Sequence, residues 1–159
     1  MKGSLLLIPN TLGNTKIQLA IPPGIGERIS HLRTFVVEDL RNARRYLKLL
    51  NKRIDIDRLT FHELNKRTAD ADLPGFLVSA EQGEDMGLIS EAGLPAVADP
   101  GADLVRHAHR MGIRVVPLPG PSSIFLALMA SGLNGQEFVF HGYLPVQHHE
   151  RVRKIRELE

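Results

Sequence analysis

Three short loops rich in glycine and proline are the places where this sequence could bind a ligand. They read "PNTLGN" (9–14), "SEAGLPAVADPG" (90–101) and "PLPGPSS" (117–123), and each follows a continuous apolar run. Glycine lets a ligand approach the backbone, and the free N–H groups at the start of a helix attract carboxylates and phosphates. The chemistry expected of these loops is therefore recognition of a ligand through main-chain groups, because none of them contains a strong candidate nucleophile.

Two of the loops also carry signals for the start of a helix. Asp99 is well placed as an N-cap, with Pro100 at the first helical position. Gly120 can begin a second helix beside the hydroxyls of Ser122 and Ser123. The alternative for each loop is an ordinary turn between a strand and a helix.

Polar side chains follow two further apolar runs. Glu38 and Asp39 come at the end of the second run and could bind a substrate hydroxyl or act as a base. They could equally form a salt bridge and a helix cap. His62, Glu63 and Asn65 follow the third run and are expected to face the same cleft.

A basic stripe is predicted on the helix that follows the second run. Its members recur every three or four residues, roughly opposite the apolar stripe of the same helix. They are Arg41, Arg45, Lys48 and Lys52. Such a stripe can contact a phosphate backbone, or it can be a solvated helix face.

Several other chemistries are excluded by the residues. The Walker and dinucleotide-binding glycine patterns are absent, as is the G-x-S-x-G pattern of a serine nucleophile. There are no cysteines, and the seven histidines are not spaced as metal ligands, so no metal site is expected.

The elements that must position these loops alternate along the chain. Five continuous apolar runs predict buried strands, and the stretches between them and after the last have helical patterns. The strands are expected at 5–9, 34–38, 58–62, 86–90 and 113–117, and the helices at 22–32, 39–52, 74–82, 100–111 and 121–132. This order favours an α/β fold with a five-stranded, mostly parallel sheet and helices on both faces.

The length and composition favour one well-filled domain. The chain has 159 residues and a formal net charge of +2, so any affinity for a polyanion must come from a local patch. Residues 1–135 are expected to form the α/β domain, and residues 136–159 a linker and the start of a truncated second domain. The first nine residues are too short for a signal peptide or a membrane span, and a cytoplasmic location is expected.

Taken together, these motifs resemble the tetrapyrrole methylase superfamily, whose members transfer a methyl group from S-adenosylmethionine. Within it, the sequence is most similar to the branch of ribosomal RNA small-subunit methyltransferase I. The matching stretches occur in the family's order across nearly the whole chain. They are "IPNTLGN" (8–14), "VEDLRNARRYL" (37–47), "FHELNKR" (61–67), "GLISEAGLPAVADPG" (87–101), "VPLPGPSS" (116–123) and "FHGYLP" (140–145).

The resemblance implies a two-domain enzyme that binds S-adenosylmethionine between its domains, with this chain covering the first. The residues carried over to the cofactor site come from all three loops. They are Leu12, Gly13, Ala92, Gly93, Leu94, Val97, Ser122 and Ser123. Because a sulfonium donor needs positioning rather than a protein nucleophile, loops made of small residues suit this chemistry.

The resemblance also implies an acceptor, for which ribosomal RNA or the small ribosomal subunit is expected, methylated on a ribose 2′-hydroxyl. Glu38, Asp39 and Asn65 are candidates for handling the proton of that hydroxyl, and the basic stripe is a candidate for binding the substrate. A corrin or porphyrin precursor is the alternative acceptor. The chain alone is expected to be inactive, since part of the cofactor pocket would come from the second domain.

A non-catalytic module is the alternative of a different class. It would bind a nucleotide-like ligand, or it would form a homodimer through the helix expected at 121–132, which is apolar nearly all round.

Overall fold

The computed structural model describes residues 1–13 and 16–159, so Asn14, the last residue of the first loop motif, lies outside the described residues. The chain forms two compact units, Met1–Leu126 and Ala127–Glu159. The boundary expected between residues 135 and 136 stays a prediction.

The first unit is built on a sheet of five parallel strands. The strands are β1 (Ser4–Ile8), β2 (Thr34–Val37), β3 (Thr60–Glu63), β4 (Met86–Ile89) and β5 (Arg114–Pro117). They lie in the order β3-β2-β4-β1-β5. The prediction of five strands is confirmed. The central strands β2 and β4 are buried at every position, which is why they read as unbroken apolar runs.

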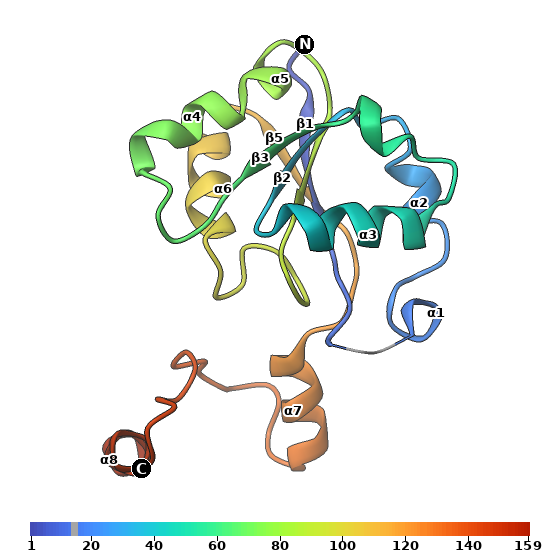
Figure 1. Ribbon diagram of the computed structural model, residues 1–159. Coiled ribbons are helices and arrows are strands. Elements are labelled where there is room, and N and C mark those ends of the chain that lie inside the picture. The colour runs from blue at the N-terminus through green and yellow to red at the C-terminus, as the bar shows by residue number, and fades with distance from the viewer. Residues whose placement is uncertain (14–15) are drawn as a thin grey trace. The chain divides into compact units, whose positions relative to one another are not determined.

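Helices cover both faces of this sheet, as predicted, and each face has its own apolar cluster (Figure 1). On one face lie α2 (Ile25–Arg28) and α3 (Leu40–Leu50), and α3 buries Ala43, Tyr46 and Leu47 there. On the other face lie α4 (Leu73–Phe76), α5 (Val78–Glu81) and α6 (Gly101–Arg110). The cluster on this second face includes Leu104 and Ala108 of α6.

The helix predicted over 22–32 is wrong in extent. Within this range the structure has the single turn α2, and another turn, α1 (Ile17–Ala20), lies before it. The break falls at Pro22, Pro23 and Gly24, where Gly24 has a φ of 91° that ends regular helix geometry.

The segment predicted as one helix over 74–82 is two turns, α4 and α5, separated at Leu77. Two 3-10 turns, η1 (Ile56–Arg58) and η2 (Asp70–Asp72), were not predicted. Helices α3 and α6 are confirmed to within one or two residues of their predicted ends.

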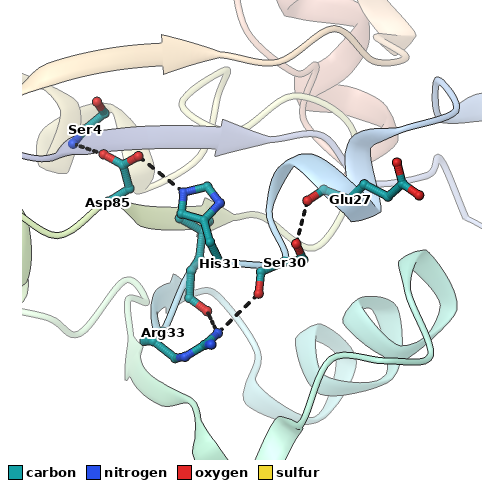
Figure 2. Close-up of polar contacts among 7 residues, drawn as sticks. Ser4, Glu27, Ser30, His31, Arg33 and Asp85 are labelled. Carbon is teal, nitrogen blue, oxygen red and sulfur yellow. Dashed lines mark hydrogen bonds and ion pairs between the residues drawn. The ribbon is translucent and has the colours of Figure 1, made fainter.

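The amino-terminal edge of the sheet is joined by one carboxylate, drawn in Figure 2. The Asp85 carboxylate accepts the Ser4 backbone N–H at 2.6 Å, and its second oxygen lies 3.3 Å from the His31 ring. Burial alone would raise the pKa of Asp85, but the hydrogen bonds from Ser4 and His31 outweigh it and the net shift is downward. This contact ties the starts of β1 and β4 to the turn that follows α2.

The second unit contains the end of α7 (Ser123–Ser131) and α8 (His148–Leu158). The stretch 137–145, in the segment expected to begin with a linker, contains no strand, and α8 follows it. Many large apolar side chains of this unit are exposed, including Met129, Val139 and Tyr143. Within residues 1–13 and 16–159, no helix combines the length and apolar character needed to cross a bilayer.

Candidate functional site

The loops that follow β1 and β4 are hydrogen-bonded to each other at the carboxyl-terminal edge of the sheet. The Asn10 backbone N–H donates to the Gly93 carbonyl at 2.8 Å, and the Gly93 N–H donates to the Thr11 carbonyl at 3.3 Å. Because β1 and β4 are neighbouring parallel strands, these two loops emerge side by side.

The loop that follows β5 closes on the other two, and glycine makes this possible. A Cβ at Gly120 would lie 2.1 Å from the Pro9 Cβ, closer than any side chain permits. A Cβ at Gly93, where φ is 68°, would lie 3.3 Å from the Leu12 side chain and 3.5 Å from the Pro121 carbonyl. The structure thus brings all three sequence-predicted loops together, with glycines at the points of closest approach.

The predicted cofactor residues lie along this edge and differ in their exposure. Gly13, Ala92, Val97 and Ser123 are exposed, Leu12 and Leu94 are half-buried, and Gly93 and Ser122 are buried. A Cβ built at Gly13 would meet nothing within 4 Å, so the space beside it is open. An edge of small residues with open space fits the loop-bound donor that the sequence predicts, although binding itself stays a prediction.

Asn10 fastens the first loop to the second and was not singled out from the sequence. It is only 7% exposed, and its amide nitrogen donates to the Ser90 and Glu91 carbonyls, both at 3.0 Å. Its side-chain oxygen accepts the Thr11 backbone N–H at 2.8 Å. All of these partners are main-chain atoms, so Asn10 fixes the backbone course of both loops.

Tyr46 of α3 supports the first loop through a hydrogen bond and was also not singled out from the sequence. Its side chain is buried in the core, and its hydroxyl donates to the Pro9 carbonyl. Burial raises the pKa of the Tyr46 phenol far above its ordinary value, so the hydroxyl stays protonated and remains a donor.

Replacing Tyr46 with phenylalanine is expected to destabilise the protein by about 1–2 kcal/mol, because it leaves a buried carbonyl without a partner. Urea unfolding followed by circular dichroism would measure this loss. Tyr143→Phe is the matched control, since Tyr143 is 74% exposed and should change nothing. Equal stability of the two variants would contradict a supporting role for the Tyr46 hydroxyl.

The loop between β4 and α6 is held in an unusual backbone shape around Asp99. Ala96 and Ala98 have φ values of 66° and 59°, in the left-handed region that non-glycine residues rarely adopt. The Asp99 carboxylate accepts the Ala96 N–H at 2.9 Å and the Gly101 N–H at 2.8 Å. The predicted N-cap role is therefore displaced by one residue: Pro100 is the N-cap, α6 begins at Gly101, and Asp99 braces the turn before it.

Asp99 is expected to make stability depend on pH. Burial raises its pKa above the ordinary value of 3.8, although the bonds from Gly101, Ala96 and Ser90 oppose the shift. The folded carboxyl then holds its proton more tightly than the unfolded one, so this contribution is full below pH 3.8 and is lost as the pH rises through the folded pKa.

Asp99→Asn should flatten that part of the stability profile, because an amide does not ionise. Chemical unfolding between pH 3 and 7 would measure it, with the exposed Asp72→Asn as control. An Asp99→Asn profile that keeps the wild-type slope would contradict the assignment.

The three candidate proton-handling residues are placed differently. One Glu38 carboxylate oxygen accepts the Glu91 N–H at 3.1 Å, which brings this side chain to the second loop. Asp39 is the N-cap of α3 and accepts the Asn42 N–H at 2.6 Å, the cap alternative left open by the sequence. Asn65 is in a turn, where its side-chain oxygen accepts the Arg67 N–H at 2.9 Å.

The prediction that His62 and Glu63 follow the third strand is wrong, because both lie within β3. The His62 ring stacks on Phe76 with centroids 5.1 Å apart, on the face of the sheet covered by α4.

Beside Glu38, a hollow of about 10 Å³ is lined by Ser90, Asp99 and Leu64, which precedes Asn65. This volume is too small for a nucleoside, so the first unit provides a surface rather than an enclosed pocket here.

The basic stripe is exposed as predicted at Arg41, Arg45, Lys48 and Lys52. Lys48 is partly committed to structure, because its amine donates to the Ile54 carbonyl at 2.6 Å. Among the described residues, no carboxylate lies within ion-pair distance of these four cations. Likewise, no group of three or more potential metal ligands gathers in 1–13 or 16–159.

Comparison with known proteins identifies the family. Proteins named ribosomal RNA small subunit methyltransferase I match nearly the whole chain: that of Pseudomonas aeruginosa is 32% identical over 157 residues, and that of Bacillus subtilis 31% over 159, each covering 99% of this chain. The chain belongs to the tetrapyrrole methylase superfamily. The protein of that name from Mesorhizobium japonicum is 42% identical over 124 residues, 77% of this chain.

This tetrapyrrole methylase chain spans about half the length of the curated relatives it matches, with 53% of the Pseudomonas protein and 51% of the Bacillus protein covered. A search against models of protein families finds no match. The family assignment therefore comes from individual relatives, and it agrees with the parallel five-stranded sheet and with the resemblance seen in the sequence.

Proposed function

We propose that this chain is the donor-binding part of an S-adenosylmethionine-dependent methyltransferase that methylates a ribose 2′-hydroxyl of small-subunit ribosomal RNA. The observation that carries the proposal is the convergence of the three loops, at Gly93 and Gly120, on one edge of a parallel sheet. The names of the relatives support RNA as the acceptor and do not favour a tetrapyrrole or a non-catalytic module.

The chain's own residues would bind the donor mainly through the backbone. Gly13, Ala92 and Val97 are exposed residues of the first two loops, and the start of α7 offers N–H groups beside Ser123 for a carboxylate. The donor would supply a methyl group on a sulfonium centre. The ribose oxygen would form a bond to that methyl carbon in line with the C–S bond that breaks, S-adenosylhomocysteine would leave, and the hydroxyl proton would pass to a base.

Glu38 is the best of the three candidates for that base. Among the described residues, the Glu91 N–H engages one of its two carboxylate oxygens, so the other can accept a proton. The Asp39 carboxylate instead caps α3. The Asn65 side-chain oxygen is held by Arg67, which leaves its amide nitrogen to donate to a ribose oxygen.

Calorimetry with S-adenosylhomocysteine tests donor binding directly on this chain. The expected result is a weak but saturable heat, because the chain spans about half the length of its relatives. No heat and no thermal shift would overturn the proposal in favour of a non-catalytic module.

Methyl transfer is tested separately, with labelled donor and small ribosomal subunits. The chain alone is expected to give no turnover, whereas a protein of the relatives' full length should be active on RNA and not on a porphyrin precursor. An enzyme that methylates ribosomal RNA works in the cytoplasm, which is therefore the proposed location. A homodimer through α7 stays a prediction that sedimentation of the chain would test.

A further inference from the structure

A cavity near the amino-terminal edge of the sheet lies at the opposite end from the three loops. It has a volume of about 770 Å³ and lies among α2, the end of α3 and the turn η1. Its floor depends on Gly26, where a Cβ would lie 2.4 Å from the Leu50 carbonyl oxygen, so glycine alone lets α2 pack this closely on α3. A cavity of this size can hold a nucleotide unit.

Three arginines line this cavity, which makes its chemistry cationic. The Arg33 guanidinium is oriented by the carbonyls of Ser30 and Leu32, at 3.2 and 3.0 Å through one nitrogen (Figure 2). Within residues 1–13 and 16–159, its other N–H groups remain available for a ligand. Arg58 pairs with Asp55 at 3.2 Å through its Nε, so its two terminal nitrogens remain available. Among the described residues, Arg53 has no carboxylate partner.

Negative groups also face the cavity, and they are fewer. Glu27 and Asp55 are the acidic lining residues, and Asp55 is already paired with Arg58. The carbonyl end of α3, equivalent to about half a negative charge, points to the same turn. The Lys48 amine offsets it by donating to the Ile54 and Lys52 carbonyls, at 2.6 and 3.4 Å.

The basic stripe runs along α3, from the carboxyl-terminal edge of the sheet to the end of the helix, where Leu50 and Asn51 line this cavity. Arg41 stands at the start of the helix, next to Asp39 and the carboxyl-terminal edge, and Lys52 lies just beyond its other end. The 11 residues of α3 extend about 16 Å, which matches about five phosphate spacings of a stacked strand.

We infer that the cavity lined by Arg33, Arg53 and Arg58 binds phosphates of the RNA substrate, at the far end of a track that runs along α3 from the methylation site. This inference rests on the proposed function for the identity of the polyanion. The arginines bind phosphate oxygens through free guanidinium N–H groups and carry no base specificity.

Binding of a fluorescently labelled, single-stranded RNA of mixed sequence tests the inference. In the double variant Arg53→Gln/Arg58→Gln, two phosphate contacts are lost. The slope of log affinity against log salt concentration should flatten by about 1.4, and the affinity near 0.1 M salt should fall about 10- to 30-fold.

The matched control is Arg106→Gln/Arg110→Gln on α6, on the other face of the sheet. It removes the same charge. Arg106 pairs with Asp103 at i−3, at 2.8 Å, and also with Asp70 at 3.4 Å, whereas Arg110 has no ion pair among the described residues. Equal effects of the two double variants on affinity and slope would overturn the inference. Displacement of the RNA by millimolar AMP would also overturn it, since the cavity would then be a mononucleotide site.

Calorimetry with S-adenosylhomocysteine on the same variants separates this inference from the proposed function. Both double variants should bind the donor like wild type, because neither touches the three loops. Donor binding without an arginine effect on RNA would refute only the phosphate track. An arginine effect without donor binding would support the track and refute the methyltransferase.

Discussion

Replacing Gly120 with alanine is expected to reduce the affinity for S-adenosylhomocysteine at least tenfold while the sheet remains folded. The new Cβ would lie 2.1 Å from the Pro9 Cβ and 2.7 Å from its Cγ, so the first and third loops must move apart. Proline is rigid and cannot yield as a flexible side chain would. The overpacking should cost about 1–3 kcal/mol of stability, and the displaced loops would no longer present a single binding edge.

Calorimetric titration of the variant, with far-ultraviolet circular dichroism to verify folding, would measure this effect. Gly75→Ala is the matched control, because a Cβ at Gly75 would meet nothing within 4 Å and its φ is not positive. If Gly120→Ala binds the donor as tightly as Gly75→Ala does, the contact between the loops is irrelevant to the donor.

The Asn10→Ala variant is expected to lose about 2–4 kcal/mol of stability, the largest loss for any polar residue of the loops. The change leaves the Ser90 and Glu91 carbonyls and the Thr11 N–H without their partner in a site that is almost fully buried. Each buried group left unpaired costs about 1–3 kcal/mol, partly recovered if water enters.

Thermal unfolding should therefore show a midpoint about 4–12 °C lower for Asn10→Ala. Asn42→Ala provides the comparison, because Asn42 is exposed on α3 and only its backbone N–H takes part in capping. A midpoint for Asn10→Ala within a degree of the control would mean that the two loops do not depend on this brace.

The strands and the two long helices could be predicted because their signals are local. Buried parallel strands require unbroken apolar runs, and α3 and α6 each repeat an apolar stripe over about three turns. Helices α1 and α2 could not be predicted as separate turns, because the apolar residues around Pro22 and Gly24 fit a helical period although the backbone breaks there.

The place of the candidate site could also be predicted, whereas the residues that hold it together could not. The three loops follow parallel strands, so the topology alone puts them on one edge. Asn10 reads as an ordinary turn former, and its partners Ser90 and Glu91 are 80 and 81 residues away. In the same way, the sequence indicates only that Tyr46 is an aromatic residue of the core. The hydrogen bond from its hydroxyl to the Pro9 carbonyl becomes evident only in the structure.

The sequence places Asn10 in the first loop, and its side chain forms hydrogen bonds with main-chain carbonyl and N–H groups. The side chains at exposed positions such as Glu91 and Val97 can therefore be replaced without breaking the hydrogen bonds of Asn10 that join the two loops. A laboratory library that randomises those positions while retaining Asn10 should yield mostly folded proteins. This edge is consequently a practical starting point for redirecting the scaffold to new acceptors.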